Sequence, residues 1–326
     1  MARPIKYHPH GSVLFVTTTV EEGLYLLANP LSRLIILSCL ARAQTLYNVT
    51  VCHAIVEGSH LHLIVVVEDP DDLCKFLGYF KGETAHRFNR LLGRTKRTIW
   101  CEGYDSPVVL TPKRALIAIA YLYANPAKDN LEDSIDQYPA FSTWKMFKKQ
   151  KHQFHSKWFF RDSYRALPLD AHNIRGYTKV TESLISQDTE QHTFEINPNG
   201  WMEAFGVTSP EEQEKVNSIL TERVRLLEAR ARKLRAVTGK RVMGRAKLIA
   251  QPIDTLYRPK NRRGRRMWCL SEVRAKRVEF INFLKKLRKE GRRVLELWRL
   301  RDYSVPYPLG LYPPSMPKVA EPLGIF

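Results

Sequence analysis

The sequence predicts an α+β protein, with a mainly antiparallel sheet in its N-terminal half and a basic, mainly helical region in its C-terminal half. Short β-branched runs alternate with runs of helical spacing up to about residue 148. Long segments of helical spacing return after residue 208. The 326 residues carry 52 Lys and Arg against 33 Asp and Glu, a net charge of +19, and most of this excess lies in the second half. This composition is typical of a folded protein and excludes a fibrous repeat.

The first predicted elements are a strand, a helix and a pair of strands. Residues 11–20 are rich in β-branched side chains and are bounded by a glycine and an acidic pair, which indicates a buried strand. Residues 30–47 have helical spacing behind a proline. Two further strand-like runs, 50–56 and 61–67, are joined by a short link rich in turn residues. We therefore expect these two strands to form an antiparallel pair.

Two helices and a short strand complete the N-terminal half. A helix is expected from Asp71 to about Leu92, and a short strand at Pro107–Leu110. Thr111 is a good N-cap for a further helix, which we expect to stop at Asn125-Pro126 because proline disfavours helix before it. The order βαββαβ followed by a helix predicts one layer of helices on the sheet, which is the ferredoxin-like, or split βαβ, plan.

The C-terminal half is expected to contain two long helices. Residues 149–208 show no clear periodicity, so they are predicted to be an irregular connector. Ser209-Pro210 begins a helix that should end before Gly239, since serine, proline and the following acidic pair form a helix start. A second helix is expected from near Ser271, with a break at Gly291. The predicted domains are the N-terminal module 1–148, the connector 149–208, a basic helical region 209–302 and a proline-rich tail 303–326.

The positive charge is concentrated in one segment. Residues 221–300 hold 26 basic and 7 acidic residues, and the rest of the chain sums to zero. Such density with interleaved aromatic rings is typical of a nucleic-acid-binding surface, because Lys and Arg bind phosphates while rings stack on bases. An acidic membrane or protein surface is the alternative. The residues that we expect to contact nucleic acid are Lys240, Arg241, Arg245, Arg262, Arg263, Arg265 and Arg266.

Other classes of protein are disfavoured by the sequence. No run reaches the roughly 18 apolar residues of a membrane span, and the first residues do not resemble a signal peptide, so no membrane contact and a cytoplasmic location are expected. The five cysteines are scattered without a Cys-x-x-Cys spacing. Neither a disulfide framework nor a structural zinc site is therefore indicated.

Two pairs of residues carry the predicted chemistry. His60 and His62 open a strand, and residues two apart project from the same face, so both imidazoles can reach one divalent cation. Tyr121 and Asn125 are four apart on a helix and share a face, whereas Tyr123 points toward the predicted core. A phenol, an amide and a two-histidine metal site together suit phosphoryl transfer. Two polar residues on a solvated sheet and a surface tyrosine on a helix remain the alternative interpretation.

Four motifs follow one another in the N-terminal half. They are Glu57-Gly58-Ser59-His60-Leu61-His62-Leu63, Thr98-Ile99-Trp100, Tyr121-Leu122-Tyr123-Ala124-Asn125-Pro126 and Tyr138-Pro139-Ala140-Phe141-Ser142-Thr143-Trp144. In this order they resemble a known family, the single-tyrosine HUH transposases, in particular the branch of REP-associated tyrosine transposases. The resemblance covers about residues 10–145. The sequence departs from the family at Gly58-Ser59, where Pro-Asn or Pro-Asp is commoner, and in its longer C-terminal half.

The resemblance implies a function for these residues. His60 and His62 would hold Mg²⁺ or Mn²⁺ with Asn125 as a third ligand, and Tyr121 would attack a phosphate of single-stranded, hairpin-containing DNA. The implied product is a 5′-phosphotyrosine intermediate with a free 3′-OH, made in the bacterial cytosol or nucleoid. A catalytically inert DNA- or RNA-binding protein and a rolling-circle type nickase are the alternatives. The sequence leaves open whether the protein is a monomer or a homodimer.

Overall fold

The computed structural model describes residues 7–21, 28–95, 98–254, 267–309 and 311. Its first elements are β1 (Ser12–Thr19), α1 (Pro30–Leu46), β2 (Thr50–Glu57), β3 (His60–Val67), α2 (Pro70–Leu91), β4 (Val108–Val109), α3 (Pro112–Lys128) and α4 (Trp144–Lys148). They are followed by β5 (Gln153–Lys157), the 3₁₀ turns η2 (Arg161–Ser163) and η3 (Leu169–Ala171), α5 (Ile174–Ile185), β6 (Gln191–Glu195), α6 (Gly200–Glu203), α7 (Pro210–Thr238), α8 (Arg245–Ala250), β7 (Cys269–Leu270) and α9 (Arg274–Arg299).

The central sheet has the strand order β2-β3-β1-β4-β7. All of its pairs are antiparallel except the short pair of β4 with β7. The register places His62 opposite Thr17 on β1, and His60 opposite Glu57 on β2. The prediction of a mixed fold with a mostly antiparallel sheet is therefore confirmed, and the predicted strand pair is β2 with β3.

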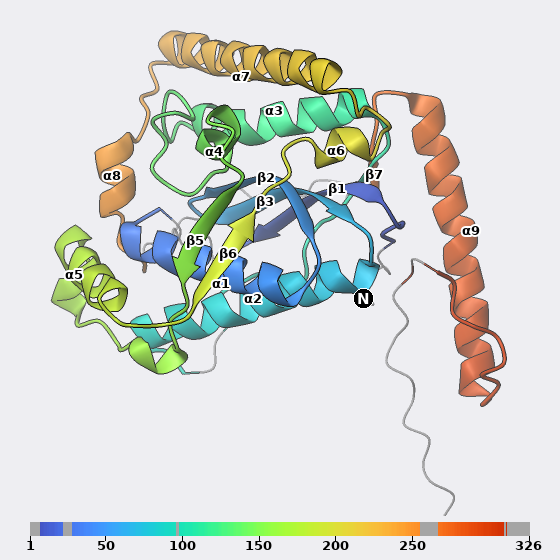
Figure 1. Cartoon of the computed structure of the whole chain (residues 1–326), viewed down its shortest axis with the longest axis horizontal. Helices are drawn as coiled ribbons and strands as arrows, with labels where there is room; N and C mark the ends of the chain where they lie inside the picture. Colours follow the sequence, from blue (N-terminus) through green and yellow to red (C-terminus); the bar gives the residue numbers. More distant parts are fainter. Residues whose placement is uncertain (1–6, 22–27, 96–97, 255–266, 310, 312–326) are drawn as a thin grey trace, which may run out of the picture.

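Helices cover both faces of the sheet (Figure 1). Helices α1 and α2 pack on one face, where Leu14 and Val16 belong to the core, and α3 lies over the other face with Val13 and Ile64. The expectation of a single helix layer is wrong. The reason lies in β2 and β3, which are apolar along most of their length and not alternating, as is typical of strands that are buried on both sides.

Local sequence signals explain where the long helices begin and end. Asn29 caps α1, because its side chain accepts a hydrogen bond of 2.8 Å from the backbone N–H of Ser32. Helix α7 begins at Pro210 and ends before Gly239, whose φ of 66° is left-handed and favours glycine. Ser209 stands at the N-cap with an extended backbone, but its hydroxyl makes no capping hydrogen bond. Among the described residues, no helix is both long and apolar enough to cross a membrane.

Helix α3 does not stop at Asn125-Pro126 as the sequence analysis expects. It continues through Pro126 to Lys128, and the backbone N–H of Asp129 still bonds to the carbonyl of Asn125. Proline lacks an N–H and disrupts the helical hydrogen bond at its own position, but here this position lies in the last turn. The extra turn carries Lys128 onto the helix face that holds Tyr121 and Asn125.

Residues 149–208 are not irregular. They contain the two-stranded β5–β6 sheet, α5 and α6, and they pack on the outer side of α1. Phe154 and Phe194 face each other across the pair and both contact Phe141. The side-chain amide of Gln44 bonds to the backbone of Glu195 twice: its N–H donates to the carbonyl, and its oxygen accepts from the backbone N–H. The sequence signal is weak because each strand has only five, mostly polar, residues.

Helix α9 continues through Gly291 without the expected break. This glycine is buried, and a Cβ there would lie 3.0 Å from the hydroxyl of Tyr307 and 3.1 Å from Leu311 Cδ1. The indole N–H of Trp298 also donates to the carbonyl of Val305 at 3.0 Å. Gly291 therefore lets the first part of the proline-rich tail approach the helix closely, and its role is packing.

Helix α7 is fixed to the N-terminal module by buried contacts. Leu220 and Val224 belong to the same core as α3. The Glu228 carboxylate is 1% exposed, accepts the backbone N–H of Ile135 at 2.7 Å and pairs with Arg225 at 3.0 Å. Helix α7, the first part of the basic region, is thus continuous with the core of the N-terminal module.

Replacing Glu228 should therefore destabilise the whole protein. We expect Glu228→Ala to lower the free energy of unfolding by about 1–3 kcal/mol, because it leaves the buried N–H of Ile135 without its acceptor and removes one of the two carboxylates that pair with Arg225. Urea denaturation followed by circular dichroism measures this change. Glu222→Ala, at an exposed position of the same helix, is the control and should change the value by less than about 0.5 kcal/mol. An equal effect of the two variants would contradict the structural role of Glu228.

Candidate functional site

The two predicted histidines lie side by side at the start of β3. Their rings are parallel, with 5.9 Å between the centroids. Each ring has a hydroxyl partner at Nδ1, which is Ser59 Oγ at 2.9 Å for His60 and Thr17 Oγ1 at 2.9 Å for His62. These bonds orient the rings and leave Nε2 as the nitrogen that each histidine can offer to a ligand. Burial lowers the pKa of both imidazoles, and the positive charge of Lys128 lowers it further, so both rings are neutral.

Tyr121, Asn125 and Lys128 form the second part of the site on α3. The Lys128 ammonium donates hydrogen bonds to Tyr121 Oη and, at 3.4 Å, to Asn125 Oδ1. Tyr121 is 42% exposed, whereas Asn125 is buried. Burial lowers the pKa of Lys128, but its bond to Tyr121 and the nearby Asp129 carboxylate, 3.6 Å away, raise it above its usual value. Lys128 therefore stays protonated against the phenol oxygen.

A buried carboxylate connects the two parts. Glu57 is 4% exposed, and its pKa is raised to about 8 by burial and by the charge of Asp129, against the opposing effects of Lys128 and a hydrogen bond from Asn125. Its Oε1 atom is buried without a hydrogen-bond partner among the described residues. Since Glu57 lies opposite His60 in the sheet, this carboxylate, the histidines and the polar face of α3 meet at one place.

The site offers few groups that could bind a divalent cation. Nowhere in the described chain do three His, Cys, Asp or Glu side chains come together in a way that could hold a metal ion. The oxygen and nitrogen groups of this region are the two imidazoles, the amide of Asn125, whose oxygen accepts from Lys128, and Glu57, which is hydrogen-bonded to that amide and whose Oε1 atom has no partner among the described residues. Neutral imidazoles whose rings are held by hydroxyl partners fit a metal ion, and nitrogen donors suit Mn²⁺ better than Mg²⁺.

The other motif residues belong to the core. Tyr123 is fully buried, as expected, and its hydroxyl lies 2.8 Å from both His53 Nδ1 and Thr143 Oγ1. Trp100 is buried, and its indole N–H donates to a threonine hydroxyl at 2.7 Å. The hydroxyl of Tyr138 donates to the carbonyl of Val56 at 3.0 Å, which joins the last motif to β2. Only Tyr121 of these aromatic residues presents its hydroxyl at the surface.

The predicted nucleic-acid contacts are distributed unevenly. Lys240 lines a groove together with Tyr121 and Lys128. Arg241 is exposed on the turn after α7. Arg245 begins α8, and its charge acts on Arg33 of α1 and not on the Tyr121 site. Arg262, Arg263, Arg265 and Arg266 lie outside the described residues.

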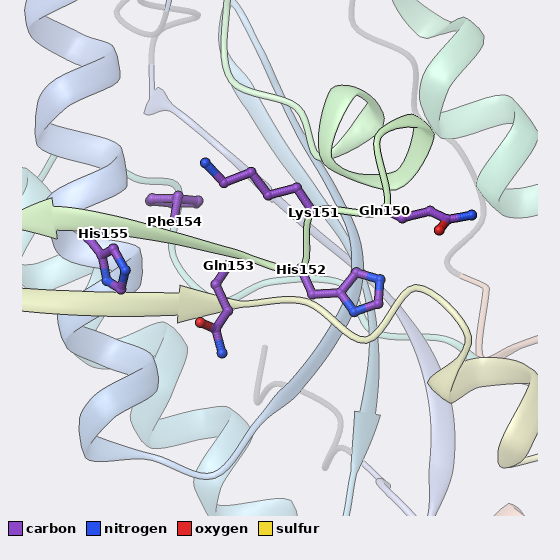
Figure 2. Close-up of a pocket in the computed structure, with 6 residues that line it drawn as sticks. All are labelled: Gln150, Lys151, His152, Gln153, Phe154 and His155. Atoms are coloured by element: carbon purple, nitrogen blue, oxygen red, sulfur yellow. The ribbon is translucent and has the colours of Figure 1, made fainter.

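A larger hollow, of about 600 Å³, lies at the start of β5, away from this site (Figure 2). It is lined by Gln150, Lys151, His152, Gln153, Phe154 and His155. Figure 2 shows these side chains pointing in different directions and not toward a common point. The hollow therefore gathers no set of groups comparable to the Tyr121 site.

Lys128 is the residue of the site that the sequence analysis misses. It follows Asn125 by three and Tyr121 by seven positions, so a helix through Pro126 places all three on one face. This spacing can be read from the sequence. It indicates a shared face only if the helix continues past Pro126, and the sequence analysis places the end of the helix there.

Comparison with solved structures gives eight matching chains, and two of these distant likenesses are described here. The chain is similar to a REP-associated tyrosine transposase solved bound to a REP hairpin, with 17% identity, 46% of this chain and 87% of that chain covered, and a TM-score of 0.40. It is also similar to a protein named only provisionally as a transposase, from Deinococcus radiodurans R1, with 16% identity, 36% and 92% covered, and a TM-score of 0.27. No protein-family model and no curated protein matches the sequence.

The buried His53 beside Tyr123 predicts sensitivity to acid. Burial lowers the pKa of His53 to about 3, whereas an unfolded histidine titrates near 6.5. The unfolded chain therefore binds one more proton between these values, and stability is lost as the pH falls from about 6.5 toward 3. His53→Asn should reduce this loss by up to about 1.4 kcal/mol per pH unit. Urea denaturation of both proteins at pH 6, 5 and 4 tests this, and parallel pH profiles would contradict it.

Proposed function

We propose that this protein is a metal-dependent endonuclease and strand transferase of single-stranded, hairpin-containing DNA, with Tyr121 as the nucleophile. The observation that carries the proposal is the position of Lys128. Its ammonium contacts the exposed Tyr121 phenol and the Asn125 amide, and its charge also reaches His60 and His62. A nucleophile, a cation beside it and a neutral two-histidine pair are the parts that phosphoryl transfer needs.

The proposal includes a scaffold. We infer a ferredoxin-like HUH domain of the REP-associated tyrosine transposase kind, supported by the strand order β2-β3-β1-β4 and by the two helices α1 and α2 on one face of the sheet. The four sequence motifs support the same inference. In this scaffold His60 and His62 share one face of β3, and α3 brings Tyr121 and Asn125 to the same place.

The residues of the site have separate parts in the proposed reaction. Lys128 holds the Tyr121 oxygen and stabilises its negative charge as the proton leaves. Thr17 and Ser59 hold the two imidazoles in the orientation that a cation requires. Mn²⁺ or Mg²⁺, when bound by the two histidines and Asn125, would act as a Lewis acid on the phosphate.

The proposed step conserves the number of phosphate ester bonds. The Tyr121 oxygen forms a bond to phosphorus, the bond from phosphorus to the 3′ oxygen breaks, and the phenol proton is balanced by the proton that the 3′ oxygen takes up. The products are a 5′-phosphotyrosine and a free 3′-OH. Attack by a 3′-OH on the phosphotyrosine reverses the step, so strand transfer needs neither water nor ATP.

A nucleic-acid-binding protein without turnover is the second candidate. The contact of Lys128 with Asn125 Oδ1 favours it, because an ammonium there competes with a metal ion for the same oxygen. The two candidates differ in one product, the covalent protein–DNA adduct.

The adduct tests the proposal directly. Wild-type protein incubated with labelled hairpin DNA and Mn²⁺ should give an adduct that resists denaturation, detected as a shifted band on a denaturing gel. Tyr121→Phe should give none, and a chelator or His60→Ala with His62→Ala should reduce the yield at least tenfold. Tyr123→Phe, assayed at low temperature because Tyr123 is buried, is the matched control and should still form the adduct. No wild-type adduct over varied hairpins, or an undiminished one in Tyr121→Phe, would contradict the function.

Lys128 should affect the rate of adduct formation. We expect Lys128→Met to slow it by about 10- to 100-fold, since a single donor to a developing oxyanion contributes an effect of this order or more. Lys113→Met removes one charge from an exposed position at the other end of α3 and serves as the control. Single-turnover kinetics on the same DNA measure both variants. Equal rates for the two would exclude Lys128 from the reaction.

A further inference from the structure

A groove lies between α3 and α7, and Tyr121 is one of the residues that line it. Its volume is about 340 Å³. Residues of α3 at spacings of three and four line one side, and residues of α7 at spacings of three and four line the other, so each set occupies one helix face. The lining residues are Tyr121, Ala124, Lys128, Asn130, Leu227, Arg230, Ala231, Leu234, Arg235, Thr238 and Lys240.

The groove combines an apolar wall with positive charge. Leu227, Ala231 and Leu234 form the wall on α7, and Leu234 is 64% exposed. Arg230 and Lys240 are exposed, and neither forms an ion pair with an acid of the described chain. None of the lining residues is acidic. An occupant should therefore be anionic and should also carry a flat or apolar part.

We propose that this groove binds one nucleotide of single-stranded DNA, next to the phosphate that Tyr121 attacks. The base lies against Leu227, Ala231 and Leu234, and the backbone phosphate lies against Arg230 and Lys240. The position of this nucleotide relative to the attacked phosphate rests on the proposed function. Its binding rests only on the groove.

Size and shape favour a single strand. A volume of about 340 Å³ lies at the low end of ligand pockets, which suits one nucleotide and excludes a duplex. A base can lie flat on an apolar wall only when it is not paired, and proteins that bind single strands combine such surfaces with a basic path for the backbone. The ring of Tyr121, which also lines the groove, already contacts the Lys128 ammonium, which lies 4.2 Å from the ring centroid.

Two other arginines of α7 have structural roles. Arg235 lines the groove but is buried, where it pairs with Asp133 and donates to the carbonyl of Ala127. Arg225 pairs with Asp136 and Glu228 and does not line the groove. Of the basic residues of α7 and the following loop that line the groove, Arg230 and Lys240 are therefore the ones whose charges are available to DNA.

Filling the groove tests the proposal. Ala231→Phe places a ring in the groove, whereas Ala236→Phe makes the same change at an exposed position on the opposite face of α7. Binding of fluorescein-labelled hairpin DNA with a single-stranded flank is measured by fluorescence anisotropy on the full chain without metal, so that no chemistry occurs. We expect Ala231→Phe to raise Kd at least tenfold and Ala236→Phe to change it less than twofold. Thermal melting of each variant checks that it is folded.

A charge variant tests the phosphate contact without altering the packing. We expect Arg230→Ala to raise Kd by about 3- to 10-fold and to reduce the slope of log Kd against log salt by about 0.7, the value for one phosphate of a single strand. Lys233→Ala removes an exposed charge from α7 outside the groove and should leave the slope unchanged.

The outcomes separate this inference from the proposed function. Wild-type affinity in both folded Ala231→Phe and Arg230→Ala would overturn the groove as a DNA site, even if the Tyr121 adduct forms. Weaker binding in these variants together with no adduct in the wild type would support the DNA site and reject the chemistry next to it. Tighter binding of an RNA of the same sequence would overturn the assignment to DNA.

Discussion

Strands β2 and β3 are buried on both of their faces, and this constraint determines most of the architecture. One face is covered by α1 and α2, so the other must be covered by further chain. Helices α3 and α6 cover it, and α7 packs on the outer side of α3 (Figure 1). Burial of this apolar surface is the dominant favourable contribution to folding. It also has a geometric consequence for the site. Helix α3 carries Tyr121, Asn125 and Lys128, so the packing of the core brings Lys128, which contacts the other two, within electrostatic reach of the histidines at the start of β3.

The electrostatics of the site follow from the same burial. Desolvation lowers the pKa of His60 and His62, and it raises that of Glu57 to about 8, so the groups behind Tyr121 tend toward their neutral forms. Lys128 is the exception, because its hydrogen bond to Tyr121 and the carboxylate of Asp129 keep it charged. The positive Lys128 ammonium beside the exposed phenol, next to neutral imidazoles, attracts an anionic ligand. The arrangement suits the approach of a phosphate from the groove between α3 and α7.

The sequence predicts those features of the fold and the site that depend on neighbouring residues, and it does not predict those that depend on contacts between distant segments. The shared faces of His60 with His62 and of Tyr121 with Asn125 follow from local periodicity, and α7 ends where Gly239 indicates. Local rules are wrong where tertiary contacts override them. Pro126 does not end α3 but lies within it. Gly291 does not break α9, because the tail packs against the space that its missing side chain leaves. The 149–208 segment folds onto α1 although its own pattern is weak. The groove joins residues about 100 positions apart and has no local signal.

The excess positive charge has two structural uses that composition alone does not separate. The turn after α3 is acidic, and Asp133 and Asp136 pair with Arg235 and Arg225 of α7. These arginines are part of the contact that holds α7 on the N-terminal module. The module is nearly neutral as a whole, but its surface is negative at the turn where α7 docks. Arg230 and Lys240 differ from these arginines, because both are exposed and neither pairs with an acid of the described chain. Both line the groove that Tyr121 also lines, so part of the charge that remains after folding faces the place where a single strand would approach the phenol.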